Sequence, residues 1–295
     1  MFKKYSEKKK GVLALILLSF VFACMGIFAR YLNAEFTILQ QTYLRIAGAF
    51  VIGIIVFWND IHINKLRKIK SKEWLVLIVR SASLYLLGVT FISAAFVEAK
   101  YSNASFIAAL PMTALLGFIL LKEKVTTEKI VYIIVGFIVV VLIAVQDYSN
   151  LFTWGRGELF ALLSSFFFAF SYISRKWHSD LLNNKELAVL IFFISSILLF
   201  VTSLLFGEGI PQANNFTQFM VFIITAAAVF NVANLFLTNY GFQKVEAVLA
   251  SNLLTLEVLF AVLIGVVLFG EYPALKELIG GILIVFSAYR MNKIS

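Results

Sequence analysis

The chain has 295 residues, of which 61% are hydrophobic and only 14% are charged. Average soluble domains carry roughly 25% charged residues, so this composition excludes an ordinary soluble domain and indicates a membrane protein. The net charge of +9 would suit nucleic acid, but clusters of Lys and Arg beside apolar stretches are more typical of membrane topology signals and of attraction to anionic lipid.

Apolar stretches, each near the ~20 residues that cross a bilayer, follow one another along the whole chain. We predict ten, at about 11–32, 37–58, 73–95, 99–121, 128–146, 157–175, 186–206, 217–240, 246–269 and 275–290. Their apolar residues do not alternate with polar ones, as they would in a transmembrane β-barrel. The sequence therefore predicts an all-α polytopic membrane protein with ten transmembrane helices.

The chain also repeats itself. Residues 11–31 align without gaps on residues 157–177, and Val97-Glu98-Ala99 returns as Val245-Glu246-Ala247. In the first alignment, the residues of the first half that are identical to their counterparts are Gly11, Leu13, Leu17, Ser19, Phe20, Phe22, Ala23 and Ile27. We predict two related five-helix halves, 1–146 and 147–295. Because each half crosses the membrane an odd number of times, the halves must be inverted, as in many secondary transporters.

The Lys and Arg residues predict the orientation. Most of the 25 lie near span ends on one side, whereas the loops on the other side hold only Lys100, Arg156 and Lys276. The positive-inside rule then places both termini in the cytoplasm of a multi-pass protein of the inner or plasma membrane.

One acid, Glu257, lies inside the ninth predicted span. It comes eleven residues after Glu246, about 16 Å along a helix, and so near the bilayer midplane. A charge at that depth is costly and usually faces protein or a water-filled cavity. We expect Glu257 to carry a proton or to contact a cationic substrate group; the alternative is a hydrogen bond to a neighbouring helix.

Two arginines lie within the spans. Arg45 is about 12 Å from the outer end of the second span, and Arg80 is about 10 Å from the inner end of the third. Each could bind a substrate carboxylate through two hydrogen bonds or could hold Glu257. Arg80 could instead extend toward the inner surface.

Uncharged polar residues and one proline complete the candidate substrate pathway. The polar residues are Tyr85, Asn103, Asn231, Asn234 and Asn252. Asn231 and Asn234 share a helix face; the alternative for each residue is a hydrogen bond that joins helices. Pro111 should kink the fourth span, either exposing carbonyls toward a cavity or serving packing alone.

Several common sequence motifs for nucleotide binding, hydrolysis and metal binding are absent from the chain. The chain contains no G-x-x-x-x-G-K-[ST], H-E-x-x-H or G-x-S-x-G motif, and its single Cys and two His show no metal-ligand spacing. The sequence therefore predicts no catalytic residues, no metal and no cofactor.

These features resemble the drug/metabolite transporter superfamily, specifically its EamA-type ten-helix members. The similar segments are G-E-L-x-A-L-L-S-S at 157–165, L-R-I-A-G at 44–48, and Leu256-Glu257 followed by Gly270-Glu271. Val258 stands where the family pattern has proline. The resemblance implies a central cavity lined chiefly by spans 1, 3, 4, 6, 8 and 9, and export of amino acids or other small metabolites.

The sequence thus favours a secondary transporter, with protons as a candidate coupling ion, the lipid bilayer and a small molecule as partners, and no nucleic acid. The rival hypothesis is an intramembrane enzyme or a non-transporting membrane scaffold, neither of which needs two-sided symmetry.

Overall fold

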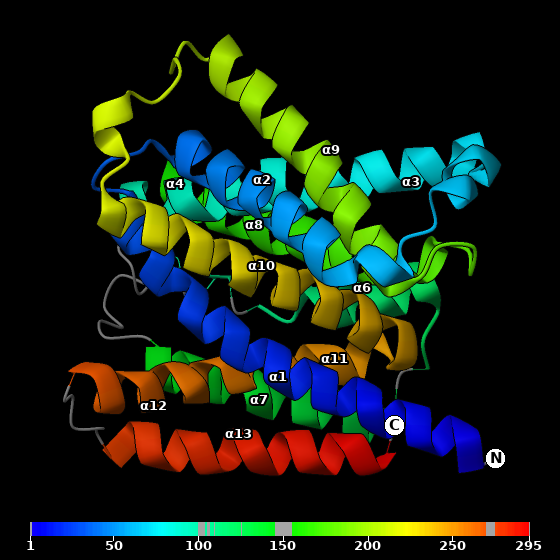
Figure 1. Cartoon of the computed structure of the whole chain (residues 1–295). Coiled ribbons are helices and arrows are strands. Elements are labelled where there is room, and N and C mark those ends of the chain that lie inside the picture. Colours follow the sequence, from blue (N-terminus) through cyan, green and yellow to red (C-terminus); the bar gives the residue numbers. More distant parts are fainter. Residues whose placement is uncertain are drawn as a thin grey trace.

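A computed structural model describes residues 2–99, 104, 107–108, 110–124, 126–144, 155–269 and 275–294. All regular elements of these residues are helical (Figure 1). The α-helices are α1 (Phe2–Leu32), α2 (Ile38–Phe57), α3 (Ser71–Ser81), α4 (Thr90–Glu98), α6 (Met112–Leu121), α7 (Thr127–Ala144), α8 (Arg156–Ile173), α9 (Asn184–Leu205), α10 (Gln218–Lys244), α11 (Ala247–Leu254), α12 (Leu256–Phe269) and α13 (Leu275–Ile294). Shorter helical segments are η1 (Trp58–Asp60), η2 (Ile63–Lys68), η3 (Ala82–Val89), η4 (Ser174–Trp177) and η5 (Ala213–Asn215).

Six stretches are long and apolar enough to cross a membrane within the residues that the structure describes. They are Ile38–Asp60, Ser71–Ala95, Arg156–Trp177, Asn184–Leu205, Gln218–Lys244 and Ala247–Ile264. The prediction of a polytopic helical membrane protein is thereby supported, and the count of ten spans stays a prediction.

The helices of the two halves interleave. Figure 1 shows α1 beside α10 and α7 beside α13, and α2 packs against both α9 and α10. In the same way α4 and η3 pack on α8, and α6 packs on α8 and α11. Each of these contacts joins a helix before residue 145 to one after residue 155, so the core is shared between the two halves.

Apolar residues divide into a core and an outer surface. Leu15, Phe192 and Phe242 are fully buried in the main core. By contrast, Ile55 is 69% exposed and Phe222 is 66% exposed. Apolar side chains exposed on helices of spanning length are expected to contact lipid.

Three predicted spans are less regular than the sequence suggested. The third runs from α3 through the π-helical segment η3 into α4, and π-helical turns are frequent at functional sites. In the fourth, α6 begins only at Met112, directly after Pro111, so the chain leaves the helix there instead of merely kinking. The ninth divides into α11 and α12 at Thr255, without a proline.

Candidate functional site

A polar cluster lies where α2, α3 and η3 approach the second half of the chain. The side chains of Arg45 on α2, Arg80 on α3 and Tyr85 on η3 are all buried. Tyr85 lies within electrostatic reach of both arginines. The structure therefore brings three of the sequence-predicted site residues together.

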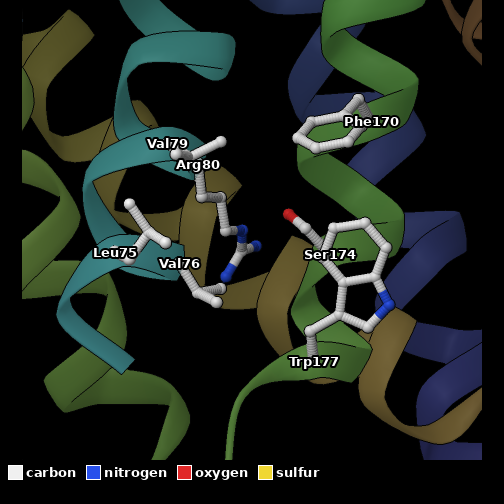
Figure 2. Close-up of a pocket in the computed structure, with 7 residues that line it drawn as sticks. All are labelled: Leu75, Val76, Val79, Arg80, Phe170, Ser174 and Trp177. Atoms are coloured by element: carbon white, nitrogen blue, oxygen red, sulfur yellow. The ribbon is translucent and has the colours of Figure 1, made fainter. Parts of the chain in front are cut away.

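Arg80 is fixed by the second half of the chain. Its Nε donates to the Ser171 carbonyl of α8 at 2.9 Å, and its Nη2 donates to Oδ1 of Asn239 on α10 at 2.6 Å. Figure 2 shows the guanidinium directed toward α8, on the side of Ser174. With no solvent-exposed area, Arg80 does not extend to the inner surface, so that alternative is wrong for this structure.

Arg45 is held within its own helix. Its Nε donates to the Gln41 carbonyl at 3.2 Å, and its Nη2 lies 3.5 Å from Thr42 Oγ1. These contacts direct the guanidinium back along α2 and leave most of its donor capacity unused.

Glu257 occupies the first turn of α12, just after the break at Thr255. The hydroxyl of Thr255 donates to the Asn252 carbonyl at 2.7 Å, which satisfies one acceptor at the broken helix end. Glu257 is half-buried and lies within electrostatic reach of Tyr172 on α8. Across the described parts of the chain, no ion pair joins it to Arg45 or Arg80, so the arginines do not hold it.

The asparagines have local partners. Asn252 donates to the Tyr132 carbonyl at 3.1 Å and to Ser287 Oγ at 2.9 Å, which links α11 to α7 and α13. The alternative of a helix-joining hydrogen bond therefore describes Asn252 better than a pathway role does. Asn231 donates to the Ala227 carbonyl of its own helix. The Thr238 hydroxyl donates to the backbone carbonyl of Asn234 at 2.8 Å and lies 3.4 Å from its side-chain Oδ1. Asn103 lies outside the described residues.

Two residues of the cluster were missed by the sequence reasoning. Tyr172 lies within electrostatic reach of Arg80, Tyr85 and Glu257 and so connects the candidate residues of both halves. Asn239 orients Arg80. Asn239 is a polar residue in the same apolar helix as Asn231 and Asn234, and that signal could have found it; nothing in the sequence distinguishes Tyr172 from other aromatic residues.

A hollow of about 180 Å³ lies between α3 and α8 beside this cluster (Figure 2). It is lined by Leu75, Val76, Val79, Arg80, Phe170, Ser174 and Trp177. Leu75 is 61% exposed, so the hollow opens on the outer surface of the bundle, where a membrane would cover it. Its walls are mainly apolar, which fits lipid chains better than a polar solute.

The family of this chain follows from its similarity to known proteins. The EamA-like transporter family matches the chain twice, over residues 9–145 and 155–292. The chain belongs to the EamA-like transporter family. A solved structure described only as a crystal structure of a protein matches with a TM-score of 0.78 and 14% identity, covering 97% of this chain and 98% of that one. That likeness shows the fold alone, and no curated protein matches.

In this EamA-like transporter, ion pairs join the two halves on the predicted cytoplasmic side. Glu186, which caps α9 together with Asn183, accepts from the His62 backbone N–H at 3.0 Å and from Lys65 at 2.9 Å. Lys185 pairs with Asp60 at 2.6 Å. These contacts bind the loop after α2 to the start of α9.

A buried histidine joins α3 to the segment after η4. The Nδ1 of His178 lies 2.8 Å from Glu73 Oε1, and the Ser179 N–H donates to the other carboxylate oxygen at 3.2 Å. Burial and the charge of Arg80 lower the pKa of His178 to about 4, although Glu73 opposes this shift. His178 is therefore neutral at pH 7 and donates from Nδ1.

Glu123 follows α6 and caps the start of α11 in the other half. Its carboxylate accepts from the backbone N–H groups of Ala247 at 2.8 Å and Val248 at 3.1 Å, and from Lys176 at 2.8 Å. Anions are stabilised at helix N-termini by the unpaired N–H groups. Burial opposes ionisation, but these donors keep the pKa of Glu123 below its usual value.

Glu123→Gln should lower the thermal midpoint by a few degrees at pH 7, because a lost ion pair and a weakened cap are together worth about 1 kcal/mol. A lowered folded-state pKa contributes stability above the ordinary value of 4.5, and this stability is lost as the pH falls through the folded pKa. The difference between wild type and variant should therefore shrink below about pH 4.5.

Thermal unfolding of purified protein from pH 7 to pH 3.5 measures this difference. Glu128→Gln, at an exposed acid in the first turn of α7, is the matched control and should change little. An equal midpoint for Glu123→Gln and wild type at pH 7 would show that the cap contributes nothing.

Proposed function

We propose that this chain is a secondary active transporter that exports small polar metabolites such as amino acids. The observation that carries the proposal is a cluster to which both halves of the chain contribute. It consists of the buried residues Arg45, Tyr85, Arg80 and Tyr172 and of half-buried Glu257. Ionisable groups inside spans usually mark substrate or ion pathways. The export direction and the substrate class rest on the family resemblance.

The mechanism we propose is alternating access, in which 1–146 and 147–295 act as inverted five-helix repeats that rock about this cluster. The interleaved packing supports it. In the two repeats α1 corresponds to α8, and the span that contains η3 corresponds to α10. The contact of α1 with α10 therefore has a symmetric counterpart in the contact of η3 with α8. The pairs α2 with α9 and α7 with α13 each join corresponding helices.

The break at Thr255 supports a site at this depth. Transporter sites are typically built at discontinuous helices, where backbone groups freed from the helix can contact solutes. Glu257 lies two residues beyond the break, so a small opening between α11 and α12 would move its carboxyl relative to the arginines. We propose that Glu257 carries the coupling proton or contacts a cationic substrate group.

Reconstitution in liposomes tests the transporter proposal. Purified protein should move a radiolabelled solute down an imposed proton or solute gradient without added nucleotide. A thermal-shift screen of small metabolites supplies the candidate solutes. Failure to transport any solute that stabilises the protein would favour the rival proposal of an intramembrane enzyme or a scaffold.

We also propose ten spans with both termini in the cytoplasm of the inner or plasma membrane. In a Cys24→Ala background, Asn214→Cys should react with an impermeant maleimide added to intact cells, whereas Asn64→Cys should react only after permeabilisation. Both positions are exposed loop asparagines, so they are matched in accessibility. The reverse pattern, or labelling of both from outside, would contradict the inverted-repeat topology.

A further inference from the structure

Among the described residues, buried Lys129 pairs with Glu246, but three buried arginines have no such partner. Arg45, Arg80 and Arg175 are all buried, and none has an ion pair with an acid in the described parts of the chain. Removing a guanidinium from water without a counter-charge is strongly unfavourable. Asp180 and Glu73 lie within electrostatic reach of Arg175, whereas no described acid does so for Arg45 or Arg80. A bound anion would supply the missing charge at these two arginines.

Arg80 differs from the other two arginines in having a fully buried donor atom that no described residue bonds. Its Nε and Nη2 are bonded, but Nη1 is buried and has no hydrogen-bond partner among the residues that the structure describes. Arg45 bonds only to its own helix, and both Nε and Nη2 of Arg175 donate to Asn184 Oδ1. Unsatisfied buried donors of charged groups are rare, so the Nη1 group of Arg80 needs an acceptor that the described residues do not supply.

Among the described residues, the groups that face Arg80 offer no carboxylate. Arg175 and His178 add positive or neutral groups, and Tyr85 and Tyr172 add phenol rings. The bonds to Ser171 and Asn239 fix the guanidinium from α8 and α10, so Nη1 is held in one direction. A fixed donor with a full charge is suited to an anionic oxygen.

We propose that Arg80 is the specificity-determining residue of the transport site and receives, through its Nη1 group, an anionic oxygen of the transported solute. This rests on the proposed function, because it names the chemical class of the solute at that same cluster. The oxygen belongs to a carboxylate or to a phosphate group. Because Nη1 is buried in this conformation, recognition requires the alternating-access movement proposed above.

The test uses full-length protein in nanodiscs of zwitterionic lipid and a panel of matched solutes. Small carboxylates, namely amino, hydroxy and keto acids, are each paired with the primary amide, and small phosphate monoesters are paired with the parent alcohols. Binding is measured by thermal shift and calorimetry. We expect one anionic set to bind at least about tenfold more tightly than its neutral partners, since hydrogen bonds between charged groups are the strong ones.

Variants then assign the preference to Arg80. Arg80→Gln should abolish the anion-to-neutral ratio, and Arg80→Lys, which keeps the charge but loses the planar fork, should restore part of it. Arg175→Gln is the matched control, because that arginine is also buried but has its donors bonded to Asn184. Because the readout is a ratio between solutes, a variant with lowered expression still reports on selectivity.

Wild-type protein that shows no preference for any anion overturns the proposal, as does a preference that survives in Arg80→Gln. Arg80-dependent stabilisation by an anionic lipid, with none by the soluble anions, would assign the site to lipid and also overturns it. Uptake of the neutral solutes into liposomes is measured separately. That measurement tests the transporter proposal, and the anion-to-neutral binding ratio tests the role of Arg80.

Discussion

Glu257→Gln should abolish the acceleration of transport by an imposed pH gradient, while counterflow of unlabelled against labelled substrate persists. Glutamine keeps the shape of the side chain and removes its ability to release a proton. Glu257 is half-buried in the first turn of α12. In the part of the chain that the structure describes, it has no partner that would explain it as part of a structural ion pair. Proteoliposomes with an imposed gradient measure the effect directly.

The control for this variant is Glu98→Gln, at an exposed acid that ends α4 and lies 3.7 Å from Arg156. It should respond to the gradient as wild type does. A folded Glu257→Gln protein that still responds fully would remove Glu257 from proton coupling. Loss of both gradient-driven transport and counterflow would instead place Glu257 in contact with the substrate.

Arg45→Ala should weaken substrate binding about tenfold to a hundredfold if the guanidinium contacts the solute, because a hydrogen bond between charged groups is worth about 1.5–3 kcal/mol. Arg45→Lys should restore only part of the affinity, since lysine lacks the planar fork. The geometry leaves room for such a contact, because Arg45 bonds only to Gln41 and Thr42 of its own helix. Equilibrium binding with the solute found by thermal shift measures it.

Thr42→Ala separates contact from positioning, because it removes the 3.5 Å hydrogen bond to Arg45 and leaves the charge in place. It should cost much less affinity than Arg45→Ala. Full wild-type binding by Arg45→Lys, with Arg45→Ala lowering only expression, would make Arg45 a structural or topological residue.

Composition and pattern alone predicted the membrane character and the all-helical fold, and the resemblance of several segments to a known family predicted the family. Long apolar stretches must be helical in a bilayer, because no water is present to bond free backbone groups. This requirement acts on each segment locally, so it can be read from the sequence. The depth of Arg45, Arg80 and Glu257 followed in the same way from the rise per residue of a helix.

The tertiary structure decided which polar residues meet. Asn252 and Asn239 look alike in the sequence, yet Asn252 bonds to Tyr132 and Ser287, whereas Asn239 bonds to Arg80. Glu123, at the end of a helix in an electrostatically unfavourable place, is stabilised by the start of α11. Tyr172 enters the cluster from the opposite half.

The physical reason for this division is the range of each interaction. The partitioning of an apolar segment into the bilayer and its helical backbone hydrogen bonds depend on residues within that segment, so both can be predicted from the local pattern. A hydrogen bond of Arg80 to a residue 159 positions later depends on the interleaving of two halves of the chain. Only the packed structure brings such partners within hydrogen-bonding distance. Only the packed structure, therefore, can identify a buried donor without a partner among the described residues, such as Nη1 of Arg80.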